Sequence, residues 1–176
     1  MMTKPAVQVN RAPVLTLWGA VVAERLGYDA QASLSLGKAL SGLNAQAKGR
    51  SLGIFQAKKT PDGGPPKKVG LGEEFWIELC GRGIPAKNTD DGIRAVVKDK
   101  PVDTAGVQQY LEKKFGEDLD RVKEAMRALA ESFESEELAS RAYSLYEKFR
   151  PVIPKGRRGW GAKGDLDLDL IRSLAE

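Results

Sequence analysis

The chain has 176 residues, a formal net charge of +4, one cysteine and no histidine. This length suits one domain with subdomains, and the missing histidine excludes Ser-His-Asp and Cys-His catalytic sites and histidine metal ligands. The single cysteine, Cys80, excludes an intrachain disulfide and a cysteine-based structural zinc site, and it favours an intracellular, cytoplasmic protein. Because no run of about 18 apolar residues occurs, we expect no membrane span.

Residues 1–9 are predicted to be a loose arm or edge strand, and an αα-hairpin follows. Apolar residues at steps of three and four predict a helix over about 12–26 with one apolar face, ended by Gly27. Asp29 caps a second helix, and the small residues in its stretch 36–47 allow close approach of a neighbouring helix. The same stretch is a candidate surface for a homo-oligomer.

Residues 56–68, QAKKTPDGGPPKK, are predicted to be a linker, because proline and glycine prevent regular structure and the lysines keep the segment solvated. The linker separates an N-terminal αα-hairpin subdomain, 1–55, from a second part, 69–176, unless the whole chain packs as one compact domain. In the second part, alternating apolar residues predict two antiparallel strands, over about 75–80 and 93–98. The intervening segment, 84–92, has residues typical of turns.

From Asp103 onward the chain is predicted to be mostly helical. Apolar spacing and stop signals indicate helices over about 103–115, 119–133 and 135–149, and a short last helix capped by Asp167 or Asp169. The predicted fold class is therefore α+β and mainly α, with an N-terminal αα-hairpin, a small antiparallel sheet and a C-terminal helical bundle.

The segment AERLGY, Ala23 to Tyr28, resembles the first helix and turn of a DNA-binding helix-turn-helix. There, an alanine, a leucine three positions later and a glycine pack the two helices at their corner. The resemblance implies that the second helix reads DNA, although Ser33 stands where a buried β-branched residue is usual and no arginine is available for guanine. An ordinary αα-hairpin with a glycine corner explains the same residues. The residues that would face the major groove are Gln31, Ser35 and Lys38.

The most unusual stretch is 151–164, PVIPKGRRGWGAKG. Its glycines match a GxGxxG dinucleotide fingerprint in letters only, because no apolar strand precedes them and no helix with a distant acidic residue follows. We therefore expect no cofactor. Glycine N–H groups, arginines and Trp160 could instead bind phosphate and stack on a base. In the alternative interpretation, Trp160 fills the helical core and the basic residues pair with the aspartates of 165–169.

Basic residues are concentrated in residues 1–68, which hold ten Lys or Arg and three Asp or Glu, whereas 69–176 hold eighteen and twenty-one. This asymmetry favours an anionic partner, DNA or RNA first. We therefore expect a non-enzymatic intracellular binding protein that engages nucleic acid through cationic loops, with no catalytic residue and no metal. The alternatives are a protein-protein interaction or scaffold module and a histidine-free enzyme acting on an anionic small molecule. The predicted nucleic-acid or anion-binding residues are Lys48, Arg50, Lys58, Lys59, Lys67, Lys68, Arg157, Arg158, Trp160 and Lys163.

Overall fold

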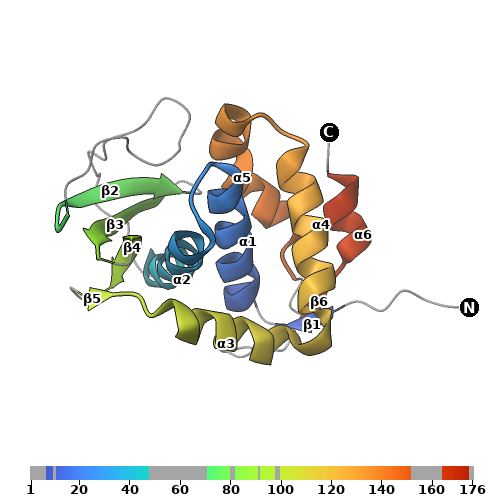
Figure 1. The fold of residues 1–176 in the computed structure, drawn as a ribbon. Coiled ribbons are helices and arrows are strands. Elements are labelled where there is room, and N and C mark those ends of the chain that lie inside the picture. The colour runs from blue at the N-terminus through green and yellow to red at the C-terminus, as the bar shows by residue number, and fades with distance from the viewer. Residues whose placement is uncertain are drawn as a thin grey trace, which may run out of the picture.

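The computed structural model describes residues 7–9, 11–47, 71–79, 82–90, 92–97, 100–151 and 164–174. These residues form a mainly helical α+β fold, with a helix pair, a small antiparallel sheet and C-terminal helices (Figure 1), so the predicted fold class is confirmed. The helices are α1 (Arg11–Arg25), α2 (Ala30–Ala47), α3 (Thr104–Phe115), η1 (Gly116–Asp118, a 3-10 helix), α4 (Leu119–Glu131), α5 (Ser135–Phe149) and α6 (Leu168–Ser173). The strands are β1 (Val7–Val9), β2 (Glu74–Leu79), β3 (Arg82–Thr89), β4 (Gly92–Val97), β5 (Lys100–Pro101) and β6 (Gly164–Leu166).

Helix α1 is the centre of the core. Every residue from Pro13 to Ala23 is buried, so the helix has no solvent-facing side over these residues, and the prediction of one apolar face was too narrow. Helices α2, α4 and α5 contact it (Figure 1). Within the described ranges, no helix is both long enough and apolar enough to cross a membrane.

Helix α2 approaches α1 so closely that glycine is needed at the contact. A Cβ on Gly37 would lie 2.2 Å from the carbonyl oxygen of Thr16, and a Cβ on Gly19 would lie 2.9 Å from the Leu40 side chain. The Thr16 hydroxyl donates a hydrogen bond to the Ser41 hydroxyl at 2.8 Å inside this contact. The close approach predicted for the small residues of 36–47 is therefore confirmed, within the chain and against α1. A homo-oligomer through 36–47 stays a prediction.

The corner between α1 and α2 forms as the local sequence predicts. Gly27 has a positive φ of 114°, a backbone conformation that favours glycine, and the Asp29 side chain accepts a hydrogen bond from the Ala32 N–H at 2.8 Å. Ser35, which the helix-turn-helix resemblance would place in a DNA groove, is buried and accepts a hydrogen bond from the Ala95 N–H of β4 at 2.9 Å. The small sheet packs against this side of α2, so Ser35 cannot face a groove, and the ordinary αα-hairpin is favoured.

The sheet is an antiparallel meander in the order β2-β3-β4-β5. The segment 84–92, predicted as turns, contains most of β3, which lies between the two predicted strands and pairs with both. Buried Ile84 and Ala86 alternate with the turn-prone residues, and this alternation positions the strand. Pro85 has no N–H to donate to a neighbouring strand. It lies opposite Trp76 of β2 and precedes Ala86, where pairing with β4 begins, so the proline does not interrupt the β3–β4 ladder.

A two-stranded ribbon joins the two ends of the chain. Strand β1 pairs antiparallel with β6, with Val7 opposite Leu166 and Val9 opposite Gly164 (Figure 1). Val9 and Leu166 are buried, so the ribbon contributes to the core. Residues 1–9 were predicted to be an arm or edge strand, and residues 7–9 form strand β1. Strand β6 was not predicted. The predicted linker, 56–68, lies outside the described residues, and the division into subdomains stays a prediction.

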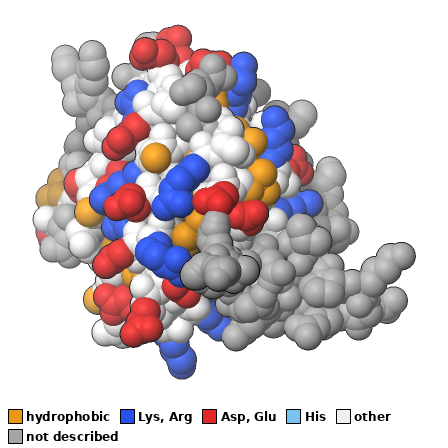
Figure 2. All heavy atoms as spheres, turned by 90° about the vertical axis from the view of Figure 1, so that its right-hand side faces the viewer, with side chains coloured by type: hydrophobic (Ala, Val, Ile, Leu, Met, Phe, Trp, Pro, Cys, Tyr) orange, Lys and Arg blue, Asp and Glu red, His pale blue; other side chains and the backbone are white. Residues whose placement is uncertain are grey.

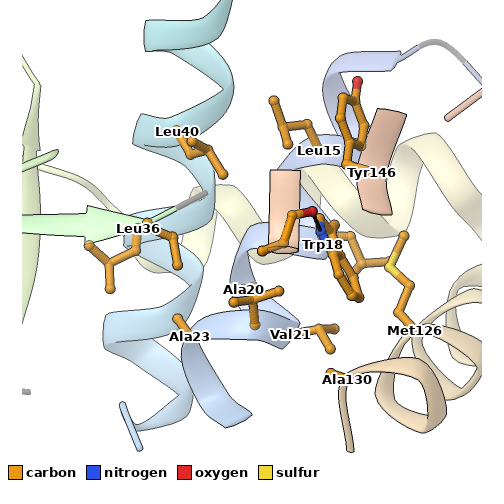
Figure 3. Packing of buried hydrophobic residues seen from close by; sticks show 14 of the residues in the cluster. Leu15, Trp18, Ala20, Val21, Ala23, Leu36, Leu40, Met126, Ala130 and Tyr146 are labelled. Carbon is orange, nitrogen blue, oxygen red and sulfur yellow. Dashed lines mark hydrogen bonds between the residues drawn. The ribbon is translucent and has the colours of Figure 1, made fainter. Parts of the chain in front are cut away.

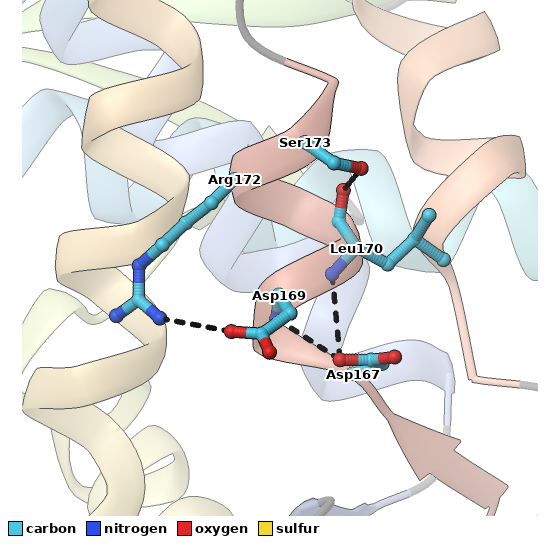
Figure 4. A network of polar contacts seen from close by, with 5 residues as sticks. All are labelled: Asp167, Asp169, Leu170, Arg172 and Ser173. Carbon is cyan, nitrogen blue, oxygen red and sulfur yellow. Dashed lines mark hydrogen bonds and ion pairs between the residues drawn. The ribbon is translucent and has the colours of Figure 1, made fainter. Parts of the chain in front are cut away.

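Helix α6 begins at a cap formed by Asp167 (Figure 4), one of the two residues predicted for this role. Its carboxylate accepts hydrogen bonds from the backbone N–H groups of Asp169 at 3.0 Å and Leu170 at 3.3 Å. These donors have no partner inside the helix, so the carboxylate satisfies them. Buried Leu168 and Ile171 then connect the short helix to the core.

We expect Asp167→Ala to lower the free energy of unfolding by about 1 kcal/mol, because the cap is lost. Asp167→Asn should stay close to the wild type, since asparagine caps helices about as well. The control is Arg172→Ala, which removes an exposed ion pair with Asp169 at 3.6 Å and should cost less than about 0.5 kcal/mol. Urea unfolding followed by circular dichroism measures all three. Equal losses for Asp167→Ala and Arg172→Ala would exclude the capping role.

Candidate functional site

None of the ten binding residues predicted from the sequence lies among the described residues. Their proposed role therefore stays a prediction, and so does the orientation of Trp160. The residues concerned are Lys48, Arg50, Lys58, Lys59, Lys67, Lys68, Arg157, Arg158, Trp160 and Lys163.

The described residues on either side of 152–163 are both held beside the start of α1. At one end, Nε of Arg11 donates a hydrogen bond to the carbonyl oxygen of Pro151 at 2.9 Å. At the other end, Gly164 pairs with Val9 in the β1–β6 ribbon. The stretch singled out in the sequence therefore leaves and re-enters the described fold at one place, next to the N-terminus of α1.

That place includes a cluster that we name the α1–α5 junction, formed by Arg11, Tyr146 and Arg150. The guanidinium carbon of Arg150 lies 5.9 Å from the centroid of the Tyr146 ring. The Tyr146 hydroxyl donates a long hydrogen bond of 3.4 Å to the carbonyl oxygen of Arg11. Burial raises the pKa of Tyr146 to about 12, although the charges of Arg150 and Arg11 oppose the increase. The hydroxyl therefore stays protonated at neutral pH and can act as a donor.

A second cluster, the α2–α3 patch, consists of Lys38, Tyr110 and Lys114. Nζ of Lys38 lies 4.5 Å from the centroid of the Tyr110 ring, and Nζ of Lys114 lies 5.9 Å from it. Both lysines are exposed and the tyrosine is partly buried, which raises its pKa. Two cations thus meet one aromatic ring at the surface where α2 packs on α3.

The face of the molecule over α4 and α6 has a different charge pattern. Figure 2 shows Lys and Arg side chains interspersed with Asp and Glu on this face. Ion pairs account for part of the pattern, since Arg121 pairs with Asp118 and Arg172 pairs with Asp169. Such a mixed surface does not favour a polyanion, so the two cationic clusters are better candidates for a binding site.

Within the described ranges, no group of three or more His, Cys, Asp or Glu side chains is arranged to hold a metal ion. Two adjacent carboxylates at the start of α5 have a structural explanation. Glu136 and Glu137 lie in the first turn of α5, where the helix dipole favours negative charge, and Glu137 pairs with Arg141 at 2.9 Å.

Sequence reasoning named neither cluster as a candidate site. Tyr110 and Lys114 are four residues apart on one helix, so their proximity could have been found from the spacing. Tyr146 and Arg150 are likewise four residues apart, at the end of α5, whereas Lys38 and Arg11 meet their partners only through the tertiary fold. The chain matches no known family model, no curated protein and no solved structure, so its function is inferred from its own residues.

Proposed function

We propose that the protein binds nucleic acid, DNA or RNA, through cationic surfaces and has no catalytic activity. The observation that carries this proposal is the α2–α3 patch, in which Lys38 and Lys114 lie against the Tyr110 ring. Lysine ammonium groups neutralise phosphates, and the counterions that the nucleic acid releases favour binding. The Tyr110 ring holds the two ammonium groups close together, which suits the patch to a phosphate backbone.

The surroundings of the patch support this function. The acidic residue of α3 closest in sequence to Tyr110 is Glu112, which lies two positions away on a different side of the helix and accepts a hydrogen bond from Gln108 at 2.9 Å. Helix α2 leads along the chain to Lys48 and Arg50, and the first 68 residues hold ten basic and three acidic residues. Lys38 thus belongs to the more cationic part of the sequence, whereas Tyr110 and Lys114 lie in residues 69–176.

The test is nucleic-acid binding by a double variant, Lys38→Gln with Lys114→Gln. At roughly 50 mM salt we expect weaker binding, because two phosphate contacts are lost. The slope of log affinity against log salt should fall in magnitude by roughly 1.4 to 1.8. Fluorescence anisotropy with labelled single-stranded and double-stranded oligonucleotides measures both quantities.

A matched control removes the same charge elsewhere, through Lys123→Gln with Lys148→Gln on α4 and α5. This control should keep most of the affinity and the steeper salt dependence. If both double variants weaken nucleic-acid binding equally, the net charge of the protein determines the affinity and the α2–α3 patch has no specific role. Absence of binding by the wild type at roughly 50 mM salt would exclude the proposed function.

A further inference from the structure

We propose that the α1–α5 junction is a binding site for a phosphate group, contacted by the guanidinium groups of Arg11 and Arg150 and by the Tyr146 hydroxyl. This site is separate from the α2–α3 patch, and it does not require that the protein bind nucleic acid.

Both arginines are positioned by the fold at one place. Nε of Arg11 is 2.9 Å from the carbonyl oxygen of Pro151, the residue that follows Arg150 in the chain. Arg150 ends α5 and lies against the Tyr146 ring, while the Tyr146 hydroxyl reaches the first residue of α1. Two arginines from opposite ends of the sequence therefore lie at one junction, one bound to the Pro151 carbonyl and the other against the Tyr146 ring.

Neither guanidinium is neutralised within the part of the chain that the structure describes. Four other helix-surface arginines each pair with a carboxylate, whereas neither Arg11 nor Arg150 forms an ion pair with a described residue. Glu147 is the acidic residue whose charge reaches Tyr146, and it forms no described ion pair with either arginine. Two positive charges thus face one negative charge, which leaves a cationic site. The four paired arginines are Arg121, Arg127, Arg141 and Arg172.

The Tyr146 hydroxyl is the second and independent indication of a ligand. Tyr146 is only 2% exposed, yet the one hydrogen bond that its hydroxyl donates to a described residue is 3.4 Å long. Hydroxyl hydrogen bonds are usually about 2.7 to 2.8 Å, and buried polar groups are normally satisfied. A phosphate oxygen beside the hydroxyl would accept the proton in place of this weak bond.

The chemistry of the site matches a phosphate better than a smaller anion. Each guanidinium can donate two parallel hydrogen bonds to phosphate oxygens, and the hydroxyl adds a further donor. The helix dipoles do not decide the affinity for phosphate. The partly positive N-terminus of α1 and the partly negative C-terminus of α5 meet here, so their effects on an anion oppose each other. Two sources share this chemistry, a free phosphate or phosphate ester and the backbone of a nucleic acid.

The experiment measures the binding of inorganic phosphate to the full chain by calorimetry and by thermal unfolding, with chloride at equal ionic strength as reference. We expect phosphate to raise the melting temperature of the wild type more than chloride does. Arg150→Gln should weaken phosphate binding by about tenfold or more, since a charge-assisted contact is lost. Glu147→Gln should strengthen it, because a competing negative charge is removed.

The matched control is Arg141→Gln, on the same helix but ion-paired with Glu137. It should bind phosphate as the wild type does. Tyr146→Phe keeps the ring and removes the hydroxyl, so it should weaken binding without unfolding the protein. The site is refuted if the wild type shows no phosphate effect, or if Arg150→Gln and Arg141→Gln bind phosphate equally.

Anisotropy with the same oligonucleotides then separates the two sources. If Arg150→Gln weakens both phosphate and nucleic-acid binding, the site holds a backbone phosphate. If it weakens phosphate binding alone, the site holds a free phosphate or phosphate ester. Loss of nucleic-acid binding in the lysine double variant with phosphate binding intact would show that the two sites are separate. If no nucleic acid binds but phosphate does, the proposed function fails and this site remains.

Discussion

Replacing Gly37 with alanine should lower the free energy of unfolding by about 1 to 3 kcal/mol, the usual cost of forcing extra atoms into a packed contact. The new Cβ would lie 2.2 Å from the carbonyl oxygen of Thr16 and 3.0 Å from the backbone nitrogen of Ala20. Both neighbours belong to the backbone of α1, so no side chain can rotate away. The two helices would have to separate, and the Thr16–Ser41 hydrogen bond would lengthen.

Gly42, on the same helix, provides a control of the opposite sign. A Cβ there would meet no atom within 4 Å, and the residue is exposed. Gly42→Ala should therefore stabilise the protein by up to about 1 kcal/mol through the better helix propensity of alanine. Urea unfolding with linear extrapolation measures both variants. If both substitutions raise the free energy of unfolding, α1 and α2 do not pack as closely as described.

The helix ends were predictable because their causes are local. Gly27 ends α1 and Asp29 caps α2 as expected, since a cap needs only its own side chain and the next few backbone groups. The small residues of α2 predicted a close contact for the same kind of reason. Their partner could not be deduced, because glycine permits approach without specifying what approaches.

Strand β3 and the full burial of α1 were harder to predict from the sequence. Pro85 and Asn88 are typical of turns, but pairing with Ile93 of β4 holds Asn88 extended. On α1, Thr16 and Gly19 interrupt the apolar pattern, and only one apolar face was predicted. Both are buried because α2 packs directly on them, and tertiary contact of this kind leaves no periodic signal.

The two cationic clusters show the same limit for functional residues. Arg11 and Arg150 lie near opposite ends of the chain, and the contact between α1 and α5 that unites them has no counterpart in residue spacing. The sequence pointed instead to segments dense in lysine and arginine, because density along the chain is visible without a fold. A high density of basic residues along the chain differs from the meeting of distant basic residues in the fold. Each described cluster includes a basic residue that reaches it only through the fold.

Trp18→Ala should produce the largest loss of stability, about 3 to 5 kcal/mol. The indole is fully buried, with 0% exposure, among residues of α4 and α5 (Figure 3). Its N–H donates a hydrogen bond to the carbonyl oxygen of Ala142 at 2.9 Å, and its ring meets Phe149 edge to face with centroids 5.2 Å apart. The substitution would leave a cavity where α1 joins α5 and remove the only donor that Trp18 offers.

Trp18→Phe separates the packing of the ring from the hydrogen bond. Phenylalanine keeps an aromatic ring beside Phe149, loses the N–H and leaves a smaller void, so we expect a loss of about 1 to 2 kcal/mol. The Ala142 carbonyl lies inside α5, where the helix itself supplies a donor, so the loss of the indole N–H leaves no unsatisfied group. Urea unfolding measures both variants. A Trp18→Phe loss as large as that of Trp18→Ala would mean that the hydrogen bond holds α1 against α5 and the buried ring does not.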